Sequence, residues 1–289
     1  HNQLFCINSS SDILEMLLAE CSLAKVDIET HSTVGSISYS EPQNENDKND
    51  QYSYVLNSQY NGKREHVRSD KISCKSLVIA TGGLSVPTLG GSGFGYDLAT
   101  KFSLDITDLS AGLVPFTFSG NIQTMAKRLS GVSRYVDVTC NGKTFREHIL
   151  FTHRGISGPA ILQISNYWKD GQSISIDLFP DQNVTDQLLK QKENQSQILI
   201  KTYLSRLLPR SLANELQTVF WPDFARTPIS EVPDKSLILI GSKLTKWTLI
   251  PAGTEGYRTA EVTRGGVSTE KISSKTMEVK GQPGLYFVG

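Results

Sequence analysis

The stretch from Lys75 to Ala99 reads KSLVIATGGLSVPTLGGSGFGYDLA and joins an apolar run to two glycine clusters. The run SLVIAT is typical of a strand covered on both faces. Gly82 and Gly83 follow it directly, and because they lack side chains they allow either the close approach of a ligand or a sharp turn. The second cluster precedes YDLATKF, where a helix N-terminus could meet an anion. Tyr96 stands where G-x-G-x-x-G requires its last glycine, so a nucleotide cradle and two structural turns both stay open.

Composition describes an ordinary globular chain. It has 289 residues, of which 38% are hydrophobic and 20% charged, with 29 basic against 29 acidic side chains. That length predicts two or three domains. A net charge of zero gives no electrostatic case for nucleic acid or an anionic membrane, so we expect neither partner. Without a membrane-spanning run or a signal pattern, and with four scattered cysteines typical of buried thiols, the sequence predicts a cytoplasmic protein without disulfides or a metal site.

The pattern of apolar residues changes twice along the chain. Residues 9–26 have helical spacing behind three serine cap candidates, 26–41 read as a strand, and 52–67 read as a hairpin turning at Asn61-Gly62. Short alternating strands follow from Leu113 to Leu178 and predict an all-β sandwich or small barrel. Residues 184–241 then look helical, and strand-like, glycine-rich character returns after Trp247.

Two short motifs resemble catalytic signatures without matching them. NGKT at 141–144 ends like a P-loop, but Asp137 occupies the place of the first glycine, and an Asn-Gly hairpin turn explains it better. GISGP at 155–159 resembles the nucleophile elbow G-x-S-x-G, with His153 nearby, but Pro159 replaces the closing glycine. A serine hydrolase using Ser157 therefore stays an alternative.

A third segment, GTEGYRTAEVTRGGV at 253–267, combines two glycine pairs with four charged side chains. Such a density of glycine and charge suits a loop that lines a ligand site. A solvated hairpin that turns at Gly265-Gly266 fits the same pattern.

Taken together, LVIATGGLSVPTLGGSGFGYDLA, LFTHRGISGPAILQISNYW and GTEGYRTAEVTRGGVSTEKI resemble one family. It is that of the bacterial NAD(P)/FAD-dependent oxidoreductases called BaiN-like or YhiN-like flavoproteins, to which aminoacetone oxidase is related. The resemblance implies an α/β fold, in which an FAD domain of two-dinucleotide-binding type is interrupted by a β-barrel-like domain and a small α-helical domain. The implied parts are a partial FAD-binding domain at 1–110, a first barrel part at 111–182, a helical domain at 183–243, a return through the barrel at 244–270 and the start of a return to the FAD domain at 271–289.

The resemblance also implies an FAD site, in which the catalytic residue is unknown and no metal is expected. Val34 would hold the adenine edge through its backbone. The residues beside the adenosine and pyrophosphate would be Thr81, Gly82 and Gly83, and those towards the isoalloxazine ring would be Thr263, Gly265, Gly266 and Val267. Backbone N–H groups near the ring could steady negative charge on the reduced flavin. Arg258 and Arg264 would anchor an anionic substrate or NAD(P), or else form exposed ion pairs.

Family members begin with a strand, G-x-G-x-x-G and a helix, and they continue beyond LYFVG with an acidic residue and a glycine-rich segment. Neither part lies within residues 1–289, so we expect this chain by itself to bind FAD weakly or not at all. The expected function is a portion of an oxidoreductase that passes a hydride through flavin to or from a small molecule. A non-redox ligand- or protein-binding module, and the Ser157 hydrolase, are the alternatives. The oligomeric state is not predicted.

Overall fold

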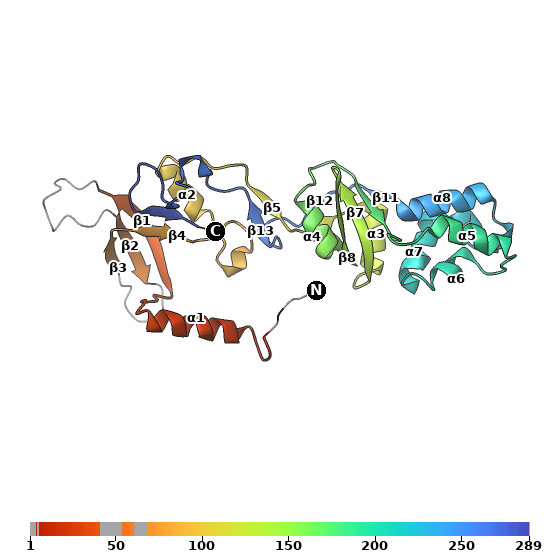
Figure 1. Cartoon of the computed structure of the whole chain (residues 1–289), viewed down its shortest axis with the longest axis horizontal. Coiled ribbons are helices and arrows are strands. Elements are labelled where there is room, and N and C mark those ends of the chain that lie inside the picture. The colour runs from red at the N-terminus through yellow and green to blue at the C-terminus, as the bar shows by residue number, and fades with distance from the viewer. Residues whose placement is uncertain (1–3, 5, 41–53, 61–68, 289) are drawn as a thin grey trace. The chain divides into compact units, whose positions relative to one another are not determined.

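The computed structural model describes Leu4 and residues 6–40, 54–60 and 69–288, which belong to two compact units. The first unit comprises the chain up to Val78 together with Gly281–Tyr286, and the second comprises Ile79–Lys280 and the residues from Phe287 onward. Figure 1 shows the elements of each. The predicted mixture of helices and strands is therefore confirmed.

The first unit contains one helix and a three-stranded antiparallel sheet. The helix is α1 (Ser11–Leu23), and the sheet has the order β1-β2-β3, from β1 (Ser32–Tyr39), β2 (Tyr54–Tyr60) and β3 (Ser69–Cys74). Ile37 and Tyr54 are buried, and the Tyr54 hydroxyl donates to the Pro283 carbonyl over 2.8 Å. The expected helix and the strand at β1 are confirmed, whereas the Asn61-Gly62 turn lies outside the described residues.

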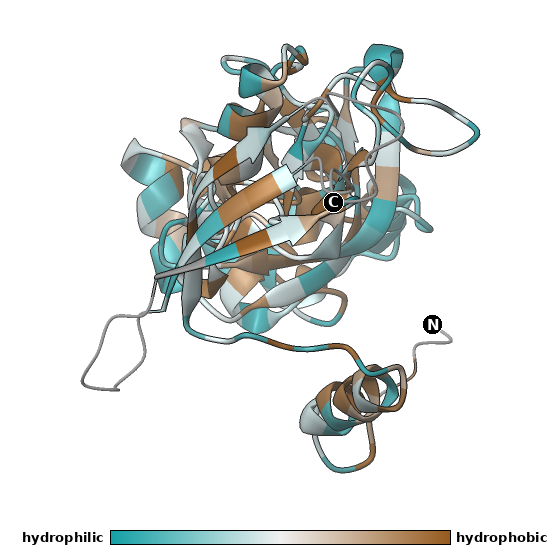
Figure 2. Ribbon diagram, turned by 90° about the vertical axis from the view of Figure 1, so that its left-hand side faces the viewer, coloured by the Kyte–Doolittle hydropathy of each residue, from teal (hydrophilic) through white to brown (hydrophobic). Residues whose placement is uncertain are grey.

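The helix α1 has an apolar stripe but no buried residue. Its stripe is seen as brown segments on the helix near the N label in Figure 2. Leu14, Met16 and Leu17 are each more than half exposed, at 58%, 53% and 53%. The spacing of apolar residues thus predicted the helix correctly, but it did not predict whether the stripe is packed.

The strand β4 (Leu77–Ile79) pairs with β14 (Leu285–Phe287). Leu77 and Ile79 are buried, but Val78 between them is 55% exposed. Side chains alternate between the faces of a strand, so only one face of β4 is covered. The prediction of a strand buried on both faces is therefore wrong. A short 3-10 turn, η1 (Pro87–Leu89), and the helix α2 (Phe94–Lys101) follow β4.

The second unit is built on a seven-stranded antiparallel sheet with the order β11-β10-β7-β8-β9-β6-β12. The strands are β6 (Phe116–Thr117), β7 (Ser133–Cys140), β8 (Lys143–Phe151), β9 (Gly155–Ser157), β10 (Ile174–Asp177), β11 (Trp247–Leu249) and β12 (Gly253–Thr254). Asn141 and Gly142, with φ of 48° and 71°, turn β7 into β8. Positive φ at both central residues is the hairpin geometry that Asn-Gly favours, so the hairpin interpretation of NGKT is confirmed.

Two helices lie within the segment that we expected to be all β. They are α3 (Gly120–Arg128) and α4 (Pro159–Ser165). Pro159 begins α4 directly after Gly158, whose φ of 93° no other residue adopts easily. The near-match to a nucleophile elbow thus arises from a strand-to-helix turn, and the alternation of neighbouring strands hid the helix.

The helical segment forms α5 (Val184–Glu193), α6 (Ile200–Leu204), α7 (Arg210–Phe220) and α8 (Asp234–Thr245), with 3-10 turns at η2 (Pro222–Phe224) and η3 (Ile229–Glu231). These helices share one hydrophobic core with the seven-stranded sheet. The Phe220 and Trp247 rings, for example, meet edge to face at 5.9 Å. The domain boundaries at 182/183 and 243/244 stay predictions, since a common core crosses both.

Candidate functional site

Two glycine-rich segments that are far apart in the sequence meet within the second unit. The Ser85 N–H donates to the Thr263 hydroxyl oxygen over 3.0 Å, and the two hydroxyl oxygens lie 2.9 Å apart. A Cβ placed on Gly83 would lie 2.6 Å from the same Thr263 oxygen. One residue further on, the Val86 N–H donates to the Tyr257 carbonyl over 2.9 Å. The segments at 81–86 and 257–263 therefore form one structure.

A two-stranded ladder brings Thr263 to this place. The strands are β5 (Ser110–Gly112) and β13 (Val262–Arg264), which run antiparallel with Thr263 opposite Ala111. Leu113 continues β5 with a φ of 48°, and its N–H donates to the Asn166 side chain over 3.2 Å while its carbonyl accepts from the Glu261 N–H. The chain thus enters and leaves the seven-stranded sheet along paired paths, which explains why residues 178 positions apart are neighbours.

Gly265 and Gly266 leave this ladder without turning back on it. A Cβ on Gly265 would lie 2.2 Å from the Asp108 carbonyl oxygen, at a φ of 82°. The Thr107 N–H donates to the Gly266 carbonyl over 2.8 Å, and the Gly266 N–H donates to the Thr107 hydroxyl over 3.0 Å. Val267 then bridges to Ile106. The solvated hairpin turning at Gly265-Gly266 is therefore wrong, because β13 pairs with β5 instead.

Tyr96 joins the site, although sequence reasoning did not include it. Its phenol is hydrogen-bonded to Thr263, and a Cβ on Gly83 would lie 2.7 Å from the phenol oxygen. Burial raises the pKa of Tyr96, the neighbouring Tyr257 phenol raises it further, and the Thr263 hydrogen bond opposes both. In the sequence, Tyr96 replaces the last glycine of G-x-G-x-x-G. That replacement was taken only as evidence against a nucleotide site, although it also marks a tyrosine at the start of the helix.

The glycines of the site leave backbone donors open. Within the described part of the chain, the N–H groups of Gly82, Gly83 and Gly265 donate to no acceptor. A Cβ on Gly82 or Gly266 would meet no atom within 4 Å. Unpaired backbone N–H groups without side chains in front of them can accept the oxygens of a phosphate. The residues present therefore fit an anionic, phosphate-bearing group such as a dinucleotide.

Val34, Arg258 and Arg264 were also predicted as site residues. Val34 belongs to the first unit, where it lies half-buried in β1 opposite Ser58, beside a register shift. Arg258 and Arg264 are exposed and form no ion pair with another described residue. The ion-pair alternative for these arginines is thus not seen, and their role as anion anchors stays a prediction.

Ser157 has no catalytic partner among the described residues. It lies in β9 opposite Leu150, and His153 is exposed without a hydrogen bond to it. A general base must reach its nucleophile by a hydrogen bond or through one water. The geometry gives no support to the serine hydrolase.

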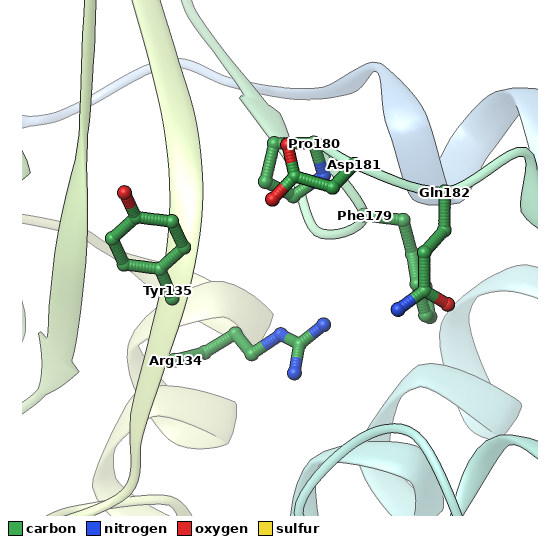
Figure 3. A pocket seen from close by; sticks show the side chains of 6 residues that line it. All are labelled: Arg134, Tyr135, Phe179, Pro180, Asp181 and Gln182. Atoms are coloured by element: carbon green, nitrogen blue, oxygen red, sulfur yellow. The ribbon is translucent and has the colours of Figure 1, made fainter.

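A cavity of about 100 Å³ lies between β7 and the turn that follows β10. Figure 3 shows Arg134 extending into it towards Phe179. The guanidinium donates to the Leu178 and Leu207 carbonyls over 2.9–3.2 Å, and its carbon lies 5.5 Å from the centre of the Phe179 ring. Burial lowers the pKa of Arg134. Because its donors are already used by backbone carbonyls, this arginine joins the sheet to the helices instead of binding a ligand.

Two smaller expectations have plain outcomes. Of the four free thiols only Cys140 is buried, while Cys6 is exposed and Cys21 and Cys74 are intermediate. The expectation of buried thiols is therefore right for one of the four. Across the described residues, no helix combines the length and apolarity that crossing a membrane would need.

Comparison with known proteins identifies relatives over almost the whole chain. Residues 110–262 match the family model described as HI0933-like protein barrel and H2TH domain. The chain is 42% identical over 289 residues to the ribosomal RNA dihydrouridine synthase of Escherichia coli K12, covering 99% of this chain and 67% of that protein. The protein of the same name from Haemophilus influenzae Rd is also 42% identical, over 290 residues and the same shares of each chain. The 3-dehydro-bile acid delta(4,6)-reductase of Clostridium scindens is 24% identical over 258 residues, which cover 77% of this chain and 58% of that protein.

These relatives correct four expectations. The assignment to BaiN-like or YhiN-like oxidoreductases is wrong, because the relatives at 42% identity are named for an RNA modification. The small-molecule oxidoreductase, its two alternatives and the keywords derived from it are wrong for the same reason. The exclusion of a nucleic-acid partner is wrong as well. The motifs that carried the resemblance are glycine turns and apolar segments, which hold no information about the substrate.

Proposed function

The chain belongs to the HI0933-like family, and from that premise we propose that it is part of a ribosomal RNA dihydrouridine synthase. The observation that carries the proposal is 42% identity over 99% of the chain to two relatives with this name. Because the chain spans about two thirds of their length, the activity is proposed for the whole protein of which these residues form the larger part. Work on ribosomal RNA would place it in the cytoplasm.

Dihydrouridine differs from uridine by two hydrogens across one carbon–carbon double bond of the base. The reaction therefore needs a hydride at one carbon and a proton at the other. A bound FAD would supply the hydride in its reduced form, and a reduced nicotinamide cofactor would return the oxidised flavin to that form. What supports FAD here is the set of open N–H donors at Gly82, Gly83 and Gly265.

The residues of this chain would bind the FAD and fix the orientation of its ring. Thr81, Gly82 and Gly83 would present backbone to the pyrophosphate. Towards the flavin ring, Thr263 is already fixed by Ser85 and Tyr96, so it would hold the ring side of the site rigidly. Gly266, whose carbonyl accepts from the Thr107 N–H, and Val267, which bridges to Ile106, would complete that side together with Gly265.

Arg258 and Arg264, which are exposed and pair with no carboxylate of the described residues, would contact phosphates of the RNA or of the nicotinamide cofactor. Raised by burial, the pKa of Tyr96 keeps its phenol protonated at neutral pH, where it serves as a hydrogen-bond partner of Thr263. No proton donor to the base is assigned.

A chimera tests this function. These 289 residues would replace the matching segment of the Escherichia coli relative, in a strain that lacks that relative, and dihydrouridine in ribosomal RNA would be measured by nucleoside mass spectrometry. Restored dihydrouridine is expected. A stable, flavin-loaded chimera that makes none would refute the function.

A second variant tests the site itself. In Gly82→Ala the added Cβ meets no atom within 4 Å, but the φ of 67° strains an L residue by about 1–2 kcal/mol, so thermal melting must show that the variant is folded. We expect weaker FAD binding by the chimera, read as flavin released on dialysis. Unchanged flavin content would show that Gly82 is only a turn.

A further inference from the structure

A groove of about 490 Å³ opens on the helical part of the second unit, around α6 and the start of α7. Its lining residues are Lys201, Thr202, Ser205, Arg206, Arg210 and Asn214. Three of the six are cations and none is acidic. Lys201 and Ser205 are half-buried, and the other four are exposed.

The positive charge of the groove is not cancelled by neighbours. None of the three cations forms an ion pair with another described residue. The adjacent carboxylate of Glu215 is held by Arg128, whose guanidinium donates to both of its oxygens over 2.6–2.7 Å. Its negative charge is therefore already compensated by Arg128. The helix α7 begins at Arg210 with no side-chain cap and no acidic residue in its first turn, which adds further positive character.

The chemistry of the lining selects the kind of ligand. Small-molecule sites are lined mostly by apolar and aromatic side chains, and this groove has none. Membrane-surface binding also requires apolar side chains that enter the lipid. A polar, strongly positive and open surface is characteristic of contact with nucleic acid, where arginine, lysine, threonine and asparagine bind phosphate oxygens.

We propose that this groove binds the phosphodiester backbone of the RNA substrate. The inference rests on the proposed function and deepens it, because it assigns RNA contact to the helices, in residues other than those of the candidate FAD site. Phosphate contacts position an RNA without reading its sequence. The groove would thus supply affinity, while the choice of uridine would belong elsewhere.

The test compares matched variants in binding of a fluorescein-labelled, unmodified single-stranded RNA, followed by anisotropy over a range of potassium chloride concentrations. The groove variant is Lys201→Gln, Arg206→Gln, Arg210→Gln. The control removes the same charge from exposed lysines of the same helical part that do not line the groove, as Lys235→Gln, Lys243→Gln, Lys246→Gln. Thermal melting checks that both fold.

The expected loss follows from counterion release. Each lost phosphate contact on a single strand lowers the log–log salt slope by about 0.7, so three contacts lower it by about 2. Affinity should then fall about 100-fold at 0.1 M salt and about 30-fold at 0.2 M. The control should keep the slope of the unaltered chain. The charge-preserving variant Arg206→Lys, Arg210→Lys should keep it too, and it remains informative if the glutamine variant fails to fold.

Other results overturn the proposal. An unchanged slope in the groove variant, or an equal loss in the control, would remove the groove from RNA binding. So would a chain that binds no RNA, or displacement of RNA by inorganic phosphate at constant ionic strength, which would indicate a small-anion site. The dihydrouridine measurement separates the two ideas. If the chimera forms dihydrouridine and the groove variant binds RNA as tightly as the unaltered chain, only the groove proposal fails. If RNA binding depends on the groove but the chimera forms no dihydrouridine, only the proposed function fails.

Discussion

Replacing Gly83 by alanine tests whether the two glycine-rich segments are held together by direct packing. The added Cβ would lie 2.6 Å from the Thr263 hydroxyl oxygen, 2.7 Å from the Tyr96 hydroxyl and 2.8 Å from the Thr263 Cβ. All three distances are below van der Waals contact, so the two segments must separate. Overpacking of this kind costs about 1–3 kcal/mol. For a unit of about 200 residues, that corresponds to a fall in Tm of roughly 2–12 °C.

A double-mutant cycle assigns this cost to its cause. Thr263→Gly removes both atoms of Thr263 that the new Cβ meets, and it loses the two hydrogen bonds to Ser85, at about 0.5–1.5 kcal/mol each. In the double variant the clash with Thr263 is absent. The two costs should therefore combine to about 1–2 kcal/mol less than their sum.

The assay is urea unfolding followed by circular dichroism and intrinsic fluorescence. Gly93→Ala is the matched control, because its φ is −79° and the nearest atom to an added Cβ, on Leu84, is 3.8 Å away. It should change stability by no more than about 0.5 kcal/mol. A Gly83→Ala protein as stable as the control, or strictly additive costs in the cycle, would refute the packing of Gly83 against Thr263.

Three further predictions concern the second unit. Arg134→Met should cost about 2 kcal/mol or more in urea unfolding, because the Leu178 and Leu207 carbonyls lose charged donors, and an unaffected midpoint would contradict this. Burial raises the pKa of Asp177 above its ordinary 3.8, so its contribution to stability is fully present below pH 3.8 and is lost as pH rises through the folded pKa. Asp177→Asn should therefore flatten the Tm-versus-pH curve over that range. A variant curve parallel to that of the unaltered chain would contradict this role of Asp177. Gly142→Ala, at a φ of 71°, should cost about 1 kcal/mol, measured by thermal melting, and a neutral result would argue against the hairpin turn.

Local rules predicted most elements because those elements follow local chemistry. The Asn-Gly pair at 141–142 has the two positive φ values that its hairpin demands, and the apolar spacing of residues 184–245 matches four helices. Burial was less predictable, since it depends on which surfaces come together. The exposed Val78 and the unpacked stripe of α1 show that an apolar pattern predicts which side chains share a face, but not whether another element covers that face.

The candidate site depends on a contact that spacing cannot reveal. Thr263 meets Ser85 only because β5 and β13 form the paired entrance and exit of an inserted sheet. No local rule links positions so far apart, and only the family resemblance placed Thr263 in one site with the Thr81–Gly83 segment that precedes Ser85. Tyr96 was missed for a related reason. It was judged against a glycine motif, whereas its phenol acts through Thr263, on the far side of the insertion.

The expectation that the chain avoids nucleic acid failed because net charge is a sum over the whole molecule. At physiological ionic strength an exposed charge is screened beyond about 8 Å, so a phosphate responds to the few side chains beside it. A chain with 29 basic and 29 acidic residues can therefore carry a groove lined by three cations, none paired with a described carboxylate, and by no acidic side chain. Lys201, Arg206 and Arg210 lie within ten positions of one another, and no acidic residue stands between them in the sequence. This local cluster of basic residues, and not the net charge of the whole chain, favours an anionic polymer as the partner.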